Sequence, residues 1–116
     1  MYIYSSYMTN IYETTIIVKP DLANDQMKNL TSSIDQFFTE NSTSIGYRED
    51  WGIKNLKFSI QKYSKGSFKF IRFISNTDFP KKLDGFLKFN NDCLRFLITK
   101  STNELEETTP QINKDN

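Results

Sequence analysis

The hydrophobic period of this chain switches repeatedly between that of a strand and that of a helix, and this feature restricts the fold more than any other. Residues 11–19, IYETTIIVK, are rich in β-branched and aromatic side chains and end at Pro20, as is typical of a strand. Within residues 27–38, apolar side chains then recur three and four positions apart, which predicts an amphipathic helix. A chain with both periods must pack helices against a sheet.

Two extended segments follow this helix and predict a β-hairpin. Residues 47–63 and 67–75 are joined near the tripeptide SKG, where Gly66 supplies the backbone freedom that a tight turn needs. Around Phe58, apolar and polar side chains alternate, so we expect the first arm to be a half-buried strand. Gly52, within the same arm, predicts a bulge or bend.

A second helix and a last strand complete the pattern. Asp78 and Pro80 are typical of a helix start, and Leu83 and Leu87 lie four positions apart on the apolar face of that helix. Residues 93–99, CLRFLIT, then predict a strand. The order strand, helix, strand, strand, helix, strand predicts an α+β ferredoxin-like plait (βαββαβ), with a four-stranded antiparallel sheet and two helices on one face.

The chain of 116 residues has the length of one domain. We assign residues 11–100 to the ferredoxin-like domain, residues 1–10 to an N-terminal extension, and residues 101–116 to a polar, acidic tail that we expect to be disordered. No apolar stretch approaches the roughly 20 residues that span a bilayer, and the extension lacks the basic region of a secretory signal. We therefore expect a soluble protein in a reducing compartment, with no membrane partner.

The composition argues against catalysis and against metal binding. The chain contains no histidine, which is the commonest general base and metal ligand. Its single cysteine, Cys93, lies in an apolar run and is expected to be a buried, unreactive thiol. Arg48, Arg72 and Arg95 have no glycine-rich anion-binding loop beside them. We therefore expect no enzymatic activity, no metal, no cofactor and no small-molecule substrate.

The sheet of such a plait carries helices on one face only, so alternate residues of its strands meet either the core or an open face. We expect Ile71 and Phe73 to meet the helices, which turns Phe68 and Phe70 toward the open face. An apolar patch rimmed by charge usually marks a binding surface, although the twisted hairpin can also bury such rings itself. The candidate protein-contact residues are Tyr12, Ile17, Phe68 and Phe70.

The basic residues concentrate on the predicted hairpin and on neighbouring strands. The net charge is only +1, but much of the acidic charge lies in the tail, so the folded body is more basic than the total. Clustered lysine and arginine side chains attract phosphates, whereas a solvated hairpin face is the alternative. The members of this cluster are Lys54, Lys57, Lys62, Lys65, Lys69, Arg72 and Arg95, and all except Lys69 are candidate RNA contacts.

The segment FKFIRF, residues 68–73, is similar to the aromatic motif with which RRM domains stack single-stranded RNA. It places Lys69 where that motif has a small residue, and the first strand offers threonine and isoleucine where a second stacking ring is needed. Because of the similarity of FKFIRF to this motif, binding of single-stranded RNA in the manner of an RRM domain is an alternative function. A regulatory domain of the ACT type, which binds a small molecule at the interface of paired sheets, is another.

A longer segment, REDWGIKNLKFSIQKYSKGSF, resembles the family of the bacterial small-subunit ribosomal protein S6. It matches the central motif of that family in order, with an acidic pair before Trp51-Gly52, then the basic Lys54, then an apolar and aromatic pair before Ile60. Asn55 departs from the family, in which a second basic residue is usual. The other matching segments are Tyr12-Glu13, Lys65-Gly66-Ser67-Phe68, Lys88-Phe89-Asn90 and CLRFLITK.

The resemblance implies the ferredoxin-like fold and a structural, non-catalytic role. Members of the family bind the central domain of small-subunit rRNA together with ribosomal protein S18, as part of the platform of the subunit. On this basis we expect Phe68 and Phe70 to contact S18 and Lys54 to contact the RNA backbone. The expected location is a ribosome, either in the cytoplasm of a bacterium with an AT-rich genome or in an organelle.

Overall fold

A computed structural model describes residues 9–101 of the chain. Its elements are β1 (Thr9–Val18), α2 (Asn24–Glu40), β2 (Ser44–Ile60), β3 (Tyr63–Asn76), α3 (Phe79–Lys88) and β4 (Cys93–Lys100). This order confirms the predicted βαββαβ pattern. Thr9 and Asn10, which we assigned to the extension, belong to β1, where they pair with Asn76 and Ser75. The predictions for residues 1–8 and 102–116 lie outside the described residues.

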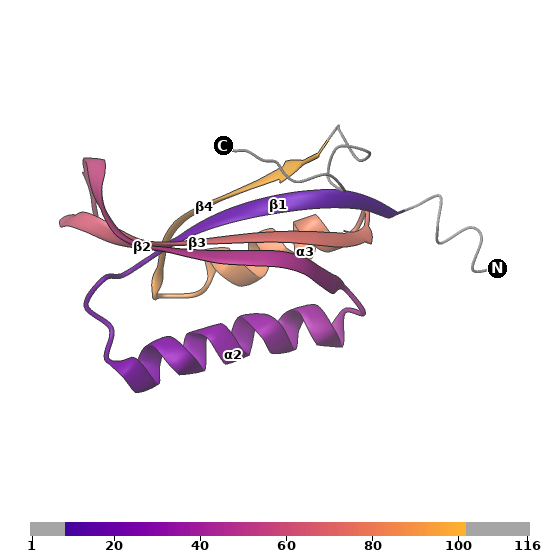
Figure 1. Cartoon of the computed structure of the whole chain (residues 1–116), viewed down its shortest axis with the longest axis horizontal. Coiled ribbons are helices and arrows are strands. Elements are labelled where there is room, and N and C mark those ends of the chain that lie inside the picture. Colours follow the sequence, from indigo (N-terminus) through magenta and orange to yellow (C-terminus); the bar gives the residue numbers. More distant parts are fainter. Residues whose placement is uncertain (1–8, 102–116) are drawn as a thin grey trace.

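The four strands form one antiparallel sheet in the order β2-β3-β1-β4. Figure 1 shows α2 and α3 on the same side of this sheet, and it shows the hairpin of β2 and β3 projecting beyond the body of the sheet at the left. The opposite side of the sheet, which neither helix covers, is called the open face from here on. The sheet therefore has one face that packs against the helices and one that no described helix covers.

The core centres on Phe73 of β3, which is fully buried. Its ring centroid lies 5.1 Å from that of Phe38 on α2 and 5.5 Å from that of Phe79 on α3, so both helices meet on one residue of the sheet. Ile71 is buried on the same face, which confirms the predicted division of β3 between core and open face. At the edge of this core, burial raises the pKa of the Cys93 thiol to about 11, which keeps the thiol protonated at neutral pH.

Tyr12 is a correction to the predicted open face. It was grouped with Ile17, but it lies on the helix side of β1, where it is 8% exposed and its ring stacks on Phe73 at 5.7 Å. The reason is the period of the strand, because Tyr12 shares its parity with the buried Thr14 and Ile16. Tyr12 is therefore a core residue.

The hairpin turn also differs from the prediction. The chain reverses at Gln61 and Lys62, whose positive φ values of 49° and 73° are those of a two-residue hairpin turn, and not at Gly66. Gly66 lies inside β3, where a Cβ would come within 2.4 Å of Ile17 Cγ2. Close approach of two strands, and not turn geometry, thus requires this glycine. The bulge predicted at Gly52 is confirmed by its φ of +78° and by a register shift at that point.

The end of β2 is more exposed than its alternating pattern predicts. Leu56 and Ile60 are half-buried as expected, but Phe58 is 80% exposed. The prediction for Phe58 was wrong because this part of the hairpin projects past the sheet and away from the helices (Figure 1). We call residues 54–65 the hairpin arm.

Candidate protein and nucleic-acid interfaces

The open face combines apolar side chains from all four strands. In the register of the sheet, Phe68 lies opposite Ile17, and Phe70 lies opposite Thr15, which is in turn opposite Leu97. Leu97 is 64% exposed, so the face retains a large apolar surface. The residues of the open face include Glu13, Ile17, Tyr47, Glu49, Trp51, Phe68, Phe70, Arg72, Ile74, Arg95 and Leu97.

Aromatic side chains of β2 fold onto Phe70 at the centre of this face. The Trp51 ring lies 5.4 Å from the Phe70 ring at an interplanar angle of 11°, and the Tyr47 ring meets it edge-on at 6.3 Å. The hairpin thus covers part of Phe70, which was one of the two outcomes considered for this ring. The covering rings stay accessible themselves, with Tyr47 46% and Trp51 40% exposed, so the surface remains aromatic.

Arg72 stands among these rings and is held by a carboxylate. Its guanidinium carbon lies 5.7 Å from the centroid of Tyr47 and 5.9 Å from that of Phe70. Its Nε and Nη2 donate to the Oε2 of Glu13 at 3.0 and 2.7 Å. This combination of cation–π contacts and a charge-assisted pair fixes the side chain in place on the face.

A second carboxylate, Glu49, organises the aromatic side chains. Its Oε1 accepts a hydrogen bond from Trp51 Nε1 at 2.6 Å, and its Oε2 accepts one from the Tyr47 hydroxyl. These bonds, with that from Tyr47 the stronger influence, hold the pKa of Glu49 below its ordinary value, and the same contact raises the pKa of Tyr47. The open face therefore carries two carboxylates, those of Glu13 and Glu49, beside its rings.

The predicted basic residues divide between two places. Lys54, Lys57, Lys62 and Lys65 are all exposed on the hairpin arm. Residues 51–77 of the sequence contain no Asp or Glu, so this segment is uniformly basic. Lys54 links the arm to the open face, because its Nζ lies 5.6 Å from the centroid of Trp51.

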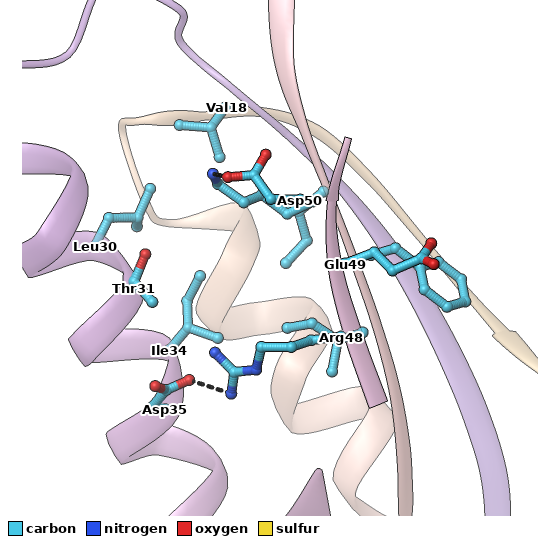
Figure 2. Close-up of a pocket in the computed structure, with 12 residues that line it drawn as sticks. Val18, Leu30, Thr31, Ile34, Asp35, Arg48, Glu49 and Asp50 are labelled. Atoms are coloured by element: carbon cyan, nitrogen blue, oxygen red, sulfur yellow. Dashed lines mark hydrogen bonds and ion pairs between the residues drawn. The ribbon is translucent and has the colours of Figure 1, made fainter. Parts of the chain in front are cut away.

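Lys69 does not belong to this basic group. It lies on the helix side of β3, where its Nζ pairs with Asp50 Oδ2 at 2.8 Å, and this bond lowers the pKa of Asp50. In Figure 2, Arg48 reaches toward Asp35 of α2, to which it pairs at 2.7 Å, whereas Glu49 points away to the other side of the strand. These two ion pairs border a groove of about 340 Å³ between α2 and the edge of the sheet.

The sequence prediction missed several side chains of the open face. Tyr47 and Trp51 share the parity of Ile45, which packs against the core, and they reach the open face because β2 shifts register between Ile45 and Tyr47. A second shift follows between Asp50 and Gly52. Each shift exchanges the two faces for the residues beyond it, and simple alternation gives no sign of this. Leu97 had a usable signal, since it shares its parity with the exposed Arg95 in β4.

The described residues contain no group of side chains suited to hold a metal ion. Within the same part of the chain, neither helix is long and apolar enough to cross a membrane.

Comparison with known proteins gives consistent matches. The family model of ribosomal protein S6 matches residues 11–100. The small ribosomal subunit protein bS6 of Aquifex aeolicus is 34% identical over 87 residues, which cover 74% of this chain and 79% of the relative. That of Geobacter sulfurreducens is 27% identical over 104 residues, or 90% of this chain and 89% of the relative.

A solved structure supports the fold. The crystal structure of the 30S ribosomal protein S6 of Thermotoga maritima superimposes with a TM-score of 0.77 at 21% sequence identity. The match covers 86% of this chain and 94% of the other. The predicted ferredoxin-like architecture is thereby confirmed.

Proposed function

Because this chain belongs to the ribosomal protein S6 family, and is therefore a structural, non-enzymatic constituent of the small ribosomal subunit, we propose that it has two separate binding surfaces. The hairpin arm binds small-subunit rRNA, in the central domain. The open face binds ribosomal protein S18, and the two contacts together help to assemble the platform. The observation that carries this division is a difference in charge, since the charged residues of the arm are all lysines, whereas the open face carries two carboxylates beside its two arginines.

The hairpin arm suits a phosphate backbone. Its four lysines are exposed, and the segment from residue 51 to residue 77 has no carboxylate of its own. Flexible lysine side chains neutralise phosphates and release counterions, which gives affinity without reading base sequence. Lys54, Lys57, Lys62 and Lys65 are the proposed RNA contacts on the arm.

The open face suits a basic protein better than RNA. The carboxylates of Glu13 and Glu49 lie beside the exposed rings and would repel phosphates, whereas they would attract the cationic side chains of a partner. Exposed aromatic residues at the centre of a surface are the usual anchors of a protein interface. The same carboxylates argue against the RRM-like alternative, in which Phe68 and Phe70 stack on bases.

The two arginines among the predicted RNA contacts take different places in this proposal. Arg72 is held by Glu13 within the aromatic cluster, so we assign it to the S18 surface. Arg95 is exposed and lies opposite Ile17, at the end of the open face nearer the hairpin arm. It stays a candidate RNA contact at the boundary between the two surfaces. The proposed location is the ribosome in a bacterial cytoplasm, with an organellar ribosome as the alternative.

The RNA contact is tested by two matched sets of lysine substitutions. Lys54, Lys57, Lys62 and Lys65 are changed to alanine together, and the control changes the four exposed helix lysines Lys28, Lys81, Lys82 and Lys88. The probe is a transcript of the central domain of bacterial small-subunit rRNA, with S18 present. The slope of log K against log salt should become shallower by about three for the arm set, since each phosphate contact contributes roughly 0.7–0.9. Equal slopes for the two sets would refute the proposed RNA surface.

The protein contact is tested at the centre of the open face. Trp51→Ala and Phe70→Ala should each weaken the affinity for purified S18 by roughly 30-fold or more, as loss of a central aromatic anchor does. Phe89→Ala is the control, because Phe89 is 85% exposed on a different part of the surface, at the end of α3. If the open-face variants lose RNA while they keep S18, the RRM-like reading replaces this one.

A further inference from the structure

The hairpin arm carries a protrusion on β2 that β3 does not match. Asn55 pairs with Lys65 and Ile60 pairs with Tyr63, so the segment Leu56–Ser59 has only Ser64 opposite it. The surplus residues leave the ladder and form a bulge larger than the usual one-residue insertion. Phe58 lies within this bulge and, at 80% exposed, presents nearly its whole side chain to solvent.

The bulge is anchored at both sides, so the ring stands on a held backbone. Leu56 turns inward, and its Cδ2 lies 3.5 Å from the point where a Cβ on Gly66 would be. On the other side, the Tyr63 hydroxyl donates to the carboxylate of Asp21, 3.2 Å from its Oδ2, and ties the arm to the loop before α2. A ring displayed by an anchored segment loses little conformational entropy when a ligand covers it.

The surroundings of this ring are cationic. Lys57 is its sequence neighbour, Lys62 occupies the turn, and Lys65 lies opposite the start of the bulge. An exposed aromatic face combined with lysines matches the two features of an unpaired nucleotide, a flat base and a charged phosphate. A phenylalanine ring has no hydrogen-bonding group, so it accepts any base without reading its identity.

We infer that Phe58 stacks on an unpaired base of small-subunit rRNA while the lysines of the hairpin arm hold the neighbouring phosphates. The inference rests on the proposed RNA-binding role of the arm and sharpens it. A continuous duplex keeps its bases stacked on one another, so the arm is directed to a bulged, looped or junction nucleotide.

The test uses substitutions of the exposed ring in the full chain. Phe58→Ala should weaken binding to the central-domain transcript, with S18 present, by roughly 5- to 150-fold, the range for one base–aromatic stack. Phe58→Leu should lose nearly as much, because it keeps apolar volume without a flat ring, and Phe58→Trp should retain the affinity. The slope of log K against log salt should stay unchanged in all three, since no charge is altered.

Ultraviolet crosslinking of the complex then identifies what the ring touches. The expected product joins a peptide that contains Phe58 to a nucleotide that is unpaired in the free transcript. The inference is overturned if Phe58→Ala binds RNA as tightly as the parent, if Phe58→Leu restores full affinity, or if the crosslink leads to S18. If Phe58→Ala has no effect but the arm lysines still change the salt slope, only the stacking fails; if the slope is also unchanged, the proposed RNA surface fails with it.

Discussion

On its helix side, β3 presents Ile71 and Phe73, which are 5% and 0% exposed, whereas on its open side it presents Phe68, Phe70 and Arg72, which are only half-buried. Both sides are aromatic, but different interactions hold them. The helix side is closed by Phe38 and Phe79 from the two helices, whose rings pack edge-on against Phe73. The open side is closed incompletely, by Trp51 and a guanidinium–carboxylate pair.

This difference shows how one strand serves both folding and binding. Rings that contact each other within the domain contribute mainly to its stability, because their burial is complete before any partner arrives. Rings that remain partly exposed beside fixed charges leave the rest of their burial for a second molecule. We therefore expect substitutions on the helix side of β3 to affect mainly stability, and those on its open side to affect mainly binding.

The largest effect should come from a matched pair on this strand. Phe73→Ala removes a fully buried ring at the meeting point of both helices and should lower the free energy of unfolding by about 3–5 kcal/mol. Phe70→Ala should cost only about 1–2 kcal/mol, because its ring is covered on one side. Denaturant unfolding of the two variants measures both values. Equal losses would mean that the open face is as much a part of the core as the helix side.

An intermediate effect should come from Gly66, where the two strands approach each other closely. Gly66→Ala places a Cβ within 2.4 Å of Ile17 Cγ2, and the resulting displacement should cost about 1–3 kcal/mol of the free energy of unfolding. Gly85→Ala in α3 is the control, since nothing lies within 4 Å of its Cβ position and alanine favours a helix by roughly 0.5–1 kcal/mol. A neutral Gly66→Ala would contradict the close packing of β1 on β3.

The smallest effect should be a pH dependence confined to the open face. The hydrogen bonds from Tyr47 and Trp51 lower the pKa of Glu49 below 4.5 in the folded protein. Their contribution to the free energy of unfolding is therefore complete at a pH above the pKa of the unfolded state, and it is lost as the pH falls through the pKa of the folded state. Trp51 is the only tryptophan of the chain, so its fluorescence should report this transition with a midpoint below 4.5. Glu49→Gln should abolish the transition. A midpoint above 4.5 would show that these bonds do not favour the carboxylate.

Much of this architecture follows from the sequence, because period and alternation are local properties. The alternation of FKFIRF correctly separates Phe73 from Phe70, and the same reasoning applied consistently to β1 would have placed Tyr12 beside Ile16 in the core. The family resemblance supplied Trp51 as part of a motif but gave it no place on the sheet. In a regular strand, the alternation of residues is thus enough to predict which side chains face the core.

The features that could not be predicted from the sequence depend on contacts between residues far apart in the chain. The register shifts of β2 decide that Tyr47 and Trp51 face Phe70, and they arise from pairing with β3. Gly66 suggested a turn, but its reason is the proximity of Ile17, nearly fifty residues earlier, while the turn itself uses Gln61 and Lys62 without any glycine. Local turn signals cannot report a glycine that tertiary packing requires.

The most direct measurement of the central claim is site-specific photocrosslinking in reconstituted small subunits. Benzoylphenylalanine replaces Leu97, which is 64% exposed on the open face, or Lys62, which lies at the turn of the hairpin arm. The account predicts that position 97 crosslinks to protein, namely S18, and that position 62 crosslinks to rRNA. If position 97 crosslinks to RNA, or position 62 to S18, the division of the molecule into a protein-binding face and an RNA-binding arm is wrong.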